Sequence, residues 1–363
     1  MTKHARLTTV PSADRIDLTR RRLTRSLGSL AVAAACGVAP AGSAIAASRD
    51  AIIREWGDPN SLVSGIAAGT LSVPSVAETV GAYTSGFGYV ELWNGRIPRE
   101  VAEFWGAPAM AGRKAAVVGP PAHRHGLIRI VELGNDFELL DPYQTLGWIA
   151  LEIRVRTPDT MVEQLRGLPF KHTGGPGDSS TAGGAPAYRA AQFKGPSGEP
   201  LYFTQHTQLD GLVPPGPNNV GPLFIQTLAA HPYAKTRDFY QVMLGLKSRM
   251  EIDVPRRALE ATFDLPPDSR YKMAAVRAPE FCSIQVDEYP DAVPARPAAD
   301  GCLPPGTAMC TFATRDVGAV AAALKGAGLP FQEIPTHALL PSGGGRALAC
   351  RGYSGEIVEF VDG

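Results

Sequence analysis

The feature that most constrains the fold of this chain is an internal repeat. Residues 193–203 align without gaps to residues 350–360, and a Gly, Ser, Gly, Glu and Phe coincide in the two segments. A shorter Gly-Leu-Pro-Phe sequence recurs at 167–170 and 328–331, ahead of each copy. Two repeated segments in the same order and at a similar spacing indicate that the second half of the chain duplicates the first.

Each copy of the repeat predicts a β-hairpin. Its Gly-x-Ser-Gly segment gives a tight turn in which Gly198 or Gly355 takes a positive φ, and the β-forming residues that follow pair back on the preceding strand. Between the halves, residues 208–220 are rich in Pro, Gly and Asn, which is the composition of a linker.

Each half also contains two units that open with a short apolar strand and continue into a helix-periodic stretch. Helical spacing follows each opening strand, for example at Val101, Phe104 and Trp105 after the first. The segment 48–83 is expected to be a helical lead ahead of the first unit. The opening strands are expected at 89–93, 148–155, 223–228 and 308–313.

A βαβββ unit that occurs twice in each half, and whose final copy ends as Ile-Val-Glu-Phe at 357–360, resembles the vicinal-oxygen-chelate superfamily. That superfamily includes glyoxalases, bleomycin resistance proteins and extradiol dioxygenases. The resemblance implies an α+β fold of four βαβββ modules that form two glyoxalase-like domains, at 84–207 and 221–363. In the superfamily, paired curved sheets enclose a cleft, and metal ligands come from the first and last strands of the modules.

Carried onto this sequence, the resemblance places the last-strand ligand positions at Arg129, Tyr202, Gln285 and Glu359. Gln285 and Glu359 have oxygen donors suited to a divalent metal, so the resemblance implies a possible but incomplete metal site in 221–363. A shift of one residue brings Gln226 into that site as a third oxygen donor. The first-strand positions fall at or next to 89, 150, 225 and 309, where no side chain suits a hard divalent ion.

Other roles follow from the chemistry of the side chains. A Glu359 that faces an apolar cleft would have a raised pKa and act as a general base, and the alternative is a solvated glutamate. Arg129 would attract a carboxylate, phosphate or enolate, and the alternative is a surface arginine paired with a nearby acid. Tyr89, Trp148 and Tyr202 would line the cleft as an aromatic wall, or else belong to the core.

Two histidines are candidates for acid–base chemistry. His231 follows the strand expected at 223–228, and His206 follows the first-half hairpin. Imidazole exchanges protons near neutral pH, so either side chain could act as an acid or base, although neither has a recognisable partner in the sequence. The catalytic candidates are Glu359 and His231.

The N-terminus predicts an export signal. Arginines at 20–22 precede an apolar stretch that runs from 27 towards 46, and small residues at 44–46 fit a signal peptidase. A twin-arginine signal over 1–47 makes the twin-arginine machinery a partner and the mature protein periplasmic or secreted. The alternative is an N-terminal anchoring helix, although the stretch is too short and too rich in Ala and Gly for a permanent span.

The formal net charge of the 363 residues is zero, so the chain has no global field that would attract nucleic acid. The expected function is that of an exported enzyme of this superfamily, with isomerase, lyase or dioxygenase-like chemistry on a small organic molecule. The alternative is a metal-free periplasmic protein that binds a small molecule without turnover. A third reading leaves only one half active. The spacing of four cysteines leaves their pairing open: Cys282, Cys302, Cys310 and Cys350.

Overall fold

The computed structural model describes residues 55–121, 123–134, 141–179, 188–209, 218–255, 257–336, 339–340 and 345–363. They belong to one compact unit, 45–363. The predicted export signal and most of the predicted linker lie outside the described residues. Within the described ranges, no helix has both the length and the hydropathy needed to cross a membrane.

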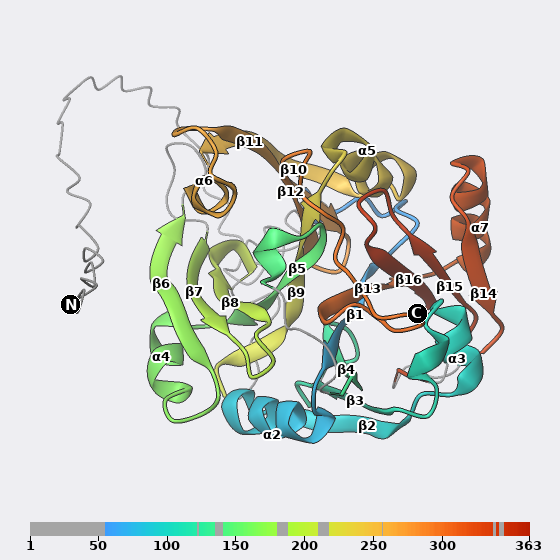
Figure 1. The fold of residues 1–363 in the computed structure, drawn as a ribbon, viewed down its shortest axis with the longest axis horizontal. Helices are drawn as coiled ribbons and strands as arrows, with labels where there is room; N and C mark the ends of the chain where they lie inside the picture. The colour runs from blue at the N-terminus through green and yellow to red at the C-terminus, as the bar shows by residue number, and fades with distance from the viewer. Residues whose placement is uncertain are drawn as a thin grey trace, which may run out of the picture. The chain divides into compact units, whose positions relative to one another are not determined.

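The first half of the chain contains two modules, each with an opening strand, a helical segment and three further strands (Figure 1). Module 1 consists of β1 (Gly65–Val73), α2 (Val76–Phe87), β2 (Val90–Arg96), α3 (Arg99–Phe104), the 3-10 turn η1 (Pro108–Met110), β3 (Lys114–Gly119) and β4 (Leu127–Glu132). Module 2 follows the turn η2 (Pro142–Gln144) and consists of β5 (Gly147–Val155), η3 (Pro158–Thr160), α4 (Met161–Gln164), β6 (Lys171–Ser179), β7 (Tyr188–Lys194), β8 (Pro200–His206) and η4 (Thr207–Leu209).

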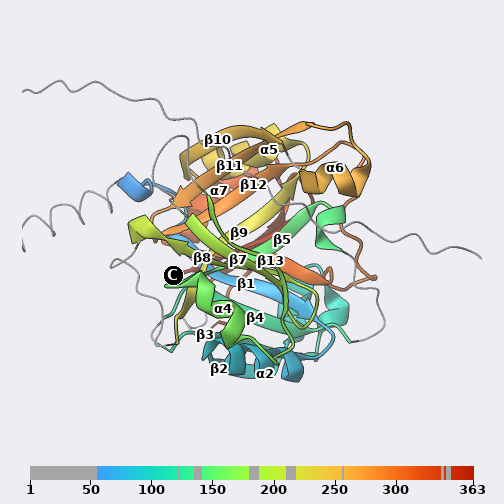
Figure 2. The ribbon, with the colours of Figure 1, turned by 90° about the vertical axis from the view of Figure 1, so that its left-hand side faces the viewer.

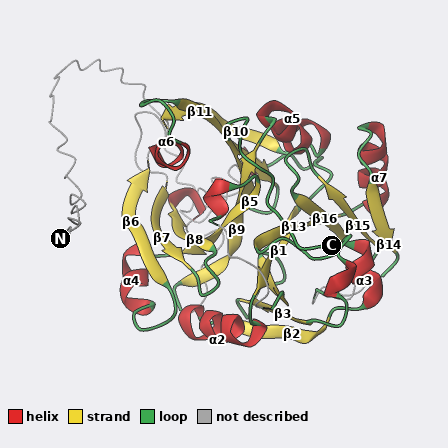
Figure 3. Cartoon of the chain, in the orientation of Figure 1, coloured by secondary structure: helices red, strands yellow, loops and turns green. Residues whose placement is uncertain are grey.

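The second half repeats this order. Module 3 consists of β9 (Val220–Ala230), α5 (Tyr233–Asp238), the π-helical turn η5 (Phe239–Met243), β10 (Lys247–Pro255), α6 (Arg257–Phe263), β11 (Arg270–Ala278) and β12 (Cys282–Glu288). Module 4 consists of β13 (Gly306–Thr314), α7 (Val317–Gly326), β14 (Phe331–Ile334), β15 (Ala347–Arg351) and β16 (Ile357–Asp362). The helices lie at the periphery, with the strands between them (Figure 3).

The strands form two eight-stranded mixed sheets, and each sheet takes one module from each half. The first sheet has the order β14-β15-β16-β13-β1-β4-β3-β2 and joins modules 1 and 4. The second sheet has the order β10-β11-β12-β9-β5-β8-β7-β6 and joins modules 2 and 3. Antiparallel pairs join the modules, β1 with β13 and β5 with β9, and these strands lie centrally in Figure 2. The predicted α+β fold of four modules is confirmed, while the strand pairing crosses the predicted domain boundaries.

The structure corrects the expected start of module 1. The segment 48–83, expected to be helical, contains β1, whose sequence Gly-Ile-Ala-Ala-Gly-Thr-Leu-Ser-Val is rich in small residues with weak strand preference. All nine residues are buried because β13 and β4 pair with β1 on either side and other elements cover its faces. Tertiary pairing therefore outweighs local preference in this segment.

The strand expected at 89–93 was predicted to open module 1, but it overlaps β2, the second strand of that module. The helix predicted after it corresponds to α3, which lies between β2 and β3. The other three opening strands, at 148–155, 223–228 and 308–313, lie within β5, β9 and β13 as predicted. The opening strand was therefore predicted wrongly for module 1 alone.

The repeated hairpin joins the two modules of the first half. Gly198 has a φ of 80°, as the turn sequence predicts. The carboxylate of Glu199, in the turn, accepts hydrogen bonds from the amide of Ser197 at 2.8 Å and from the hydroxyl of Tyr83 on α2 at 2.8 Å. A Cβ at Gly195 would lie 2.0 Å from a carboxylate oxygen of Glu199, which explains the glycine at that position. Module 1 thus supports the hairpin of module 2.

The second half repeats these contacts between modules 3 and 4. Gly355 has a φ of 79°, and Glu356 accepts from the amide of Ser354 at 2.8 Å and from the hydroxyl of Tyr240 at 3.2 Å. A Cβ at Gly352 would again lie 2.0 Å from the glutamate oxygen. The sequence repeat therefore corresponds to a repeated set of contacts in three dimensions.

One continuous hydrophobic core lies between the two sheets. It includes Leu71 and Phe312 from the first sheet and Leu151 and Phe203 from the second. Trp148 on β5 also belongs to it, and its indole nitrogen donates to the carbonyl oxygen of Ile357 at 2.8 Å, across to β16. Four cysteines are buried, and none of them forms a disulfide: Cys282, Cys302, Cys310 and Cys350.

Candidate functional site

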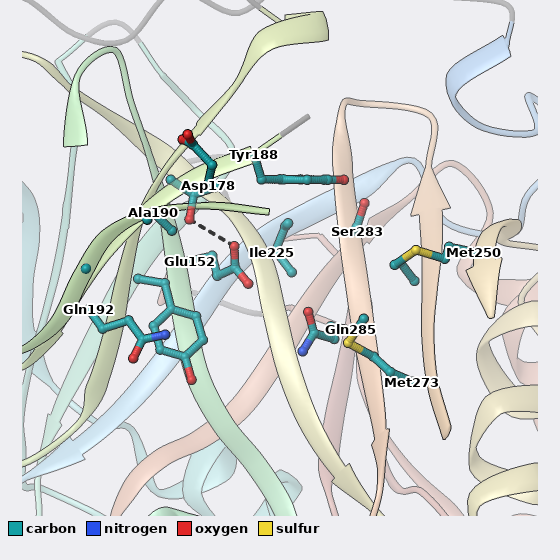
Figure 4. Close-up of a pocket in the computed structure, with 15 residues that line it drawn as sticks. Glu152, Asp178, Tyr188, Ala190, Gln192, Ile225, Met250, Met273, Ser283 and Gln285 are labelled. Atoms are coloured by element: carbon teal, nitrogen blue, oxygen red, sulfur yellow. Dashed lines mark hydrogen bonds between the residues drawn. The ribbon is translucent and has the colours of Figure 1, made fainter. Parts of the chain in front are cut away.

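A cavity of about 410 Å³ lies against one face of the second sheet. All eight strands of that sheet contribute to its lining, and on β7, β8, β11 and β12 the lining residues are two apart, as expected for side chains on one face. In Figure 4, Glu152 lies in the middle of the labelled residues, with Tyr188 and Ser283 towards one end and Gln285 and Met273 towards the other. Ile225, Met250, Met273 and Ala275 supply apolar surface. The cavity is therefore mainly apolar, with a carboxyl group near its centre.

Glu152 is the buried acid of this cavity. It projects from β5, is 7% exposed, and accepts a hydrogen bond from the hydroxyl of Thr204 on β8 at 3.1 Å. Burial raises the pKa of Glu152 to about 7, the hydrogen bond from Thr204 opposes the rise, and the charge of Asp287 adds to it. Near neutral pH the side chain therefore exists in both its acid and its carboxylate form.

Tyr202 and Gln285 give the cavity two further polar groups. The hydroxyl of Tyr202 on β8 lies 2.7 Å from the hydroxyl of Tyr143, and the amide nitrogen of Gln285 on β12 donates to Asp287 at 3.1 Å. Burial raises the pKa of Tyr202 well above its ordinary value, with the Tyr143 contact adding to the rise. Tyr202 is therefore a neutral hydrogen-bonding group at physiological pH.

The two sheets have matched central positions. In the second sheet, Glu152 pairs with Tyr202, and Gln285 pairs with Thr227, across parallel neighbouring strands. In the first sheet the corresponding pairs are Thr311 with Glu359, and Thr70 with Arg129. Tyr202 and Glu359 occupy the same place in the sequence repeat, one residue before its final Phe. Three of the four places thus carry different side chains in the two sheets, and the fourth is a threonine in both, Thr227 and Thr70.

In the first sheet these places hold a buried ion pair. Arg129 Nη2 lies 2.9 Å from Glu359 Oε2, and both side chains are fully buried. Arg129 Nε donates to Thr70 Oγ1 at 3.0 Å, and the hydroxyl of Thr311 donates to Glu359 Oε2 at 2.6 Å. The indole nitrogen of Trp105 donates to Glu359 Oε1 at 2.6 Å, and its ring lies 4.7 Å from the guanidinium carbon of Arg129. These polar groups therefore bind one another.

The residues predicted as a metal site are not brought together. Gln285 lies on β12 of the second sheet and Glu359 on β16 of the first, because modules 3 and 4 enter different sheets. The structure instead joins Arg129 with Glu359, and Tyr202 with Gln285. Arg129 is not a surface arginine and Glu359 is not solvated, since both are 0% exposed.

Four further candidates lie outside the cavity lining. Tyr89 is buried and donates to the carbonyl oxygen of Gly221 at 2.6 Å, and Trp148 belongs to the core between the sheets. Gln226 is buried on β9 and donates to the carbonyl oxygen of Met309 at 3.3 Å. His231 is partly exposed, and its Nδ1 lies 3.5 Å from Asp291.

Sequence reasoning missed Glu152. The signal was present, because Glu152 is the one acidic residue in the otherwise apolar run of β5 before Arg154. The predicted ligand position on this strand fell on residue 150, two residues earlier, where the chain has Ala. Thr204, Ser283, Met250 and Met273 carried no such signal, because the sequence does not reveal which strands share a sheet.

The central residues fit a resident metal ion poorly. A guanidinium stands among the first-sheet positions and would repel a cation. In the second sheet the acids that line the cavity are Glu152 and Asp178, and Asp178 already pairs with Arg189 at 2.8 Å, which leaves Glu152 as the one unpaired carboxylate in the described lining. Among the residues that the structure describes, no group of three or more His, Cys, Asp or Glu could hold a metal ion. We therefore derive no chemical step through a metal.

Comparison with known proteins supports the fold assignment. Residues 226–360 match the family model described as Glyoxalase/Bleomycin resistance protein/Dioxygenase superfamily, a range that runs from β9 to β16. No curated protein sequence matches this chain significantly.

Several solved structures share the fold. A glyoxalase I variant from Zea mays is 18% identical, with a TM-score of 0.56, over 89% of this chain and 97% of its own. Glyoxalase I from Zea mays is 19% identical, with a TM-score of 0.55, over 82% and 92%. A putative dioxygenase from Bacillus subtilis subsp. subtilis str. 168 is 14% identical, with a TM-score of 0.54, over 83% and 86%. The chain therefore has a glyoxalase-like fold, and its residues 226–360 are similar to the Glyoxalase/Bleomycin resistance protein/Dioxygenase superfamily.

Proposed function

We propose that this protein acts on a small organic molecule in the second-sheet cavity, with Glu152 as the group that gives and takes a proton. The observation that carries the proposal is the position of this buried acid, near the centre of a mainly apolar cavity and with a pKa of about 7. A carboxyl group transfers protons best when its pKa lies near the working pH. Isomerase or lyase chemistry that begins with removal of a proton next to a carbonyl suits this arrangement.

The neighbours of Glu152 would assist such a step. The hydroxyl of Thr204 holds one oxygen of Glu152 at 3.1 Å, which leaves the other oxygen for a substrate C–H. Tyr202 and Gln285, which also line the cavity, can donate hydrogen bonds to a substrate carbonyl, where negative charge develops as the proton leaves. The roles of Gln285 and Tyr202 proposed here need no metal.

The second candidate function is binding without turnover. The apolar surface from Ile225, Met250 and Met273 favours it, because such a cavity can hold a ligand through burial alone. In that case Glu152 would act only as a hydrogen-bonding group.

Hydrogen–deuterium exchange would separate the two functions. Chelator-treated protein in D2O would be incubated with phenylpyruvate and with 4-phenyl-2-butanone, and loss of the C–H signal next to each carbonyl would be followed by NMR. Proton transfer by Glu152 predicts exchange above the buffer rate for at least one probe and about a 100-fold or larger loss in Glu152→Gln.

The matched control is Glu163→Gln on α4, whose side chain is 69% exposed and which should exchange at the wild-type rate. Undiminished exchange in Glu152→Gln, or loss of exchange on chelation, would contradict the proposal. Binding of both probes with no exchange in any variant would favour the binding function.

We further propose that the protein is exported by the twin-arginine pathway, on the strength of the arginines at 20–22 and the apolar stretch that follows them. Replacing Arg20 and Arg21 with Lys should retain the protein in the cytoplasm of a bacterial host that has this pathway, as followed by cell fractionation. Unchanged export of that variant would contradict the proposal.

A further inference from the structure

One end of the cavity borders a cluster of side chains that the proposed reaction does not use. We define the cationic end by Trp56, Tyr188, His206 and Arg277. Arg277 follows Met273 and Ala275 on β11 at steps of two residues, and His206 follows Tyr202 and Thr204 on β8 in the same way. Alternation along a strand therefore directs both side chains to the cavity face of the sheet.

Strand register places this cluster beside the lining residues Tyr188 and Ser283. Tyr188 pairs with His206 across β7 and β8, and Arg277 pairs with Ser283 across β11 and β12. The rings of Tyr188 and His206 lie 4.4 Å apart in an edge-on arrangement. Tyr188 is therefore the member of the cationic end that lines the cavity, and it contacts His206 directly.

Arg277 is held in this cluster without an acidic partner among the described residues. Its guanidinium carbon lies 3.6 Å from the centre of the Trp56 ring, and Nη2 lies 3.5 Å from His206 Nε2. Burial lowers the pKa of Arg277, and a hydrogen bond with Tyr188 opposes that change. Arginine remains charged at physiological pH even when buried, so the cavity end carries a positive charge.

The His206 side chain is uncharged and so does not change the positive charge of Arg277. Burial, followed by the charges of Arg277, Arg154 and Arg249, lowers the pKa of His206 to about 3. The imidazole is therefore neutral at pH 7, and the charges that act on it come from arginines on three different strands.

The cluster also contains hydrogen-bond donors that lack acceptors. Arg277 is 6% exposed and Trp56 is 2% exposed, and neither Arg277 Nε nor Trp56 Nε1 has a partner among the described residues. Both atoms can only donate. Neither residue lines the cavity itself, but Arg277 interacts with Tyr188, which does, and Tyr188 packs against the hydrophobic cluster that contains Trp56. Leaving buried donors unsatisfied is costly, so a ligand that supplies acceptor atoms at this end would stabilise the cluster.

The contacts of Arg277 and Tyr188 indicate a class of substrate, an inference that rests on the proposed function. We infer that the ligand of the second-sheet cavity carries an anionic group of the carboxylate class, which Arg277 and Tyr188 hold at the cationic end. The Tyr188 hydroxyl interacts with Arg277, and Tyr188 lines the cavity. The buried charge of Arg277 therefore strengthens a hydrogen bond that Tyr188 donates to the ligand. The rest of the ligand then lies against Ile225, Met250 and Met273, within reach of Glu152.

Calorimetry with a matched pair of probes would test this inference. The probes are 4-phenylbutanoate and its uncharged amide, 4-phenylbutanamide, which differ only in the group expected at the cationic end. The wild-type protein should bind the carboxylate about 10- to 100-fold more tightly than the amide, since charge-assisted hydrogen bonds are the stronger ones. Arg277→Gln should lose this preference while it keeps its affinity for the amide, and Arg277→Lys should retain part of it.

The control is Arg166→Gln, just after α4, because the Arg166 side chain is 71% exposed and pairs with Glu163 away from the cavity lining. This variant should keep the wild-type preference. Amide binding by Arg277→Gln shows that the cavity is intact, so a folding defect is distinguished from a lost charge. Equal binding of both probes by the wild-type protein overturns the anion inference and leaves the cavity function standing. Binding of neither probe overturns both.

Discussion

Glu359 and Glu152 are both buried glutamates at the centre of a sheet, but their surroundings differ. Glu359 lies 2.9 Å from the guanidinium of Arg129, so its negative charge is compensated. Glu152 accepts a hydrogen bond from the neutral Thr204 hydroxyl, and burial raises its pKa to about 7. In the first sheet Glu359 thus neutralises the buried cation Arg129, whereas in the second sheet Glu152 can exchange a proton.

The ion pair of the first sheet should be structural. Glu359→Gln leaves the buried guanidinium of Arg129 without its counter-charge, and breaking a buried pair in this way costs about 3–5 kcal/mol. Urea denaturation should show this loss in the free energy of unfolding. The double variant Arg129→Met with Glu359→Leu removes both charges and should recover much of the stability.

A suitable control is Glu333→Gln, which breaks the exposed pair of Glu333 with Arg346 and should change the free energy of unfolding little. If Glu359→Gln were as stable as the wild-type protein, the ion pair would have no structural role. Cavity binding should persist in all variants that fold, because the pair lies in the other sheet.

At the scale of elements, the two hairpins each bury a carboxyl group. Burial raises the pKa of Glu199 and of Glu356 to about 7, against the opposing effect of hydrogen bonds from the backbone and from Tyr83 or Tyr240. Together with Glu152, three buried acids therefore hold their protons to a higher pH in the folded chain than in the unfolded one.

The sign of the resulting pH dependence follows from linkage. Between the ordinary pKa of 4.5 and a pKa of about 7, the unfolded chain releases these protons while the folded chain keeps them. The unfolded state then binds fewer protons, so the stability of the fold decreases as pH rises through this window. Thermal melting of the double variant Glu199→Gln with Glu356→Gln should show a weaker dependence on pH than melting of the wild-type protein. An identical dependence in both proteins would contradict the raised pKa values.

The hairpins were also the elements that the sequence predicted best. Their glycines have a local physical requirement, a positive φ at Gly198 and Gly355, and such requirements are visible in the residue type. Strand β1 lacked a local signal, because its small residues become a strand only through pairing with β13 and β4. Arg129, Tyr202, Gln285 and Glu359 lie on the last strands of their modules, but which of these strands share a sheet depends on long-range pairing that no local pattern encodes.

For the whole molecule, the exchange of modules between the halves predicts mutual dependence. Each sheet needs one module from each half, so residues 55–209 or 218–363 expressed alone should not fold as stable monomers. Mixing the two fragments should restore the circular dichroism of the intact chain and give a one-to-one complex in size-exclusion chromatography. A fragment that melts cooperatively as a monomer would show that a half is sufficient for folding.

The contact of Tyr83 with Glu199 has an evolutionary consequence. Helix α2 belongs to a module of the first sheet, yet it supports the turn that leads into β8, the strand that carries Tyr202 and Thr204. Deletion of the first sheet would remove the helix that supports this turn of the second. Selection for the cavity would thereby also preserve module 1, and mutations there would reduce activity at a distance.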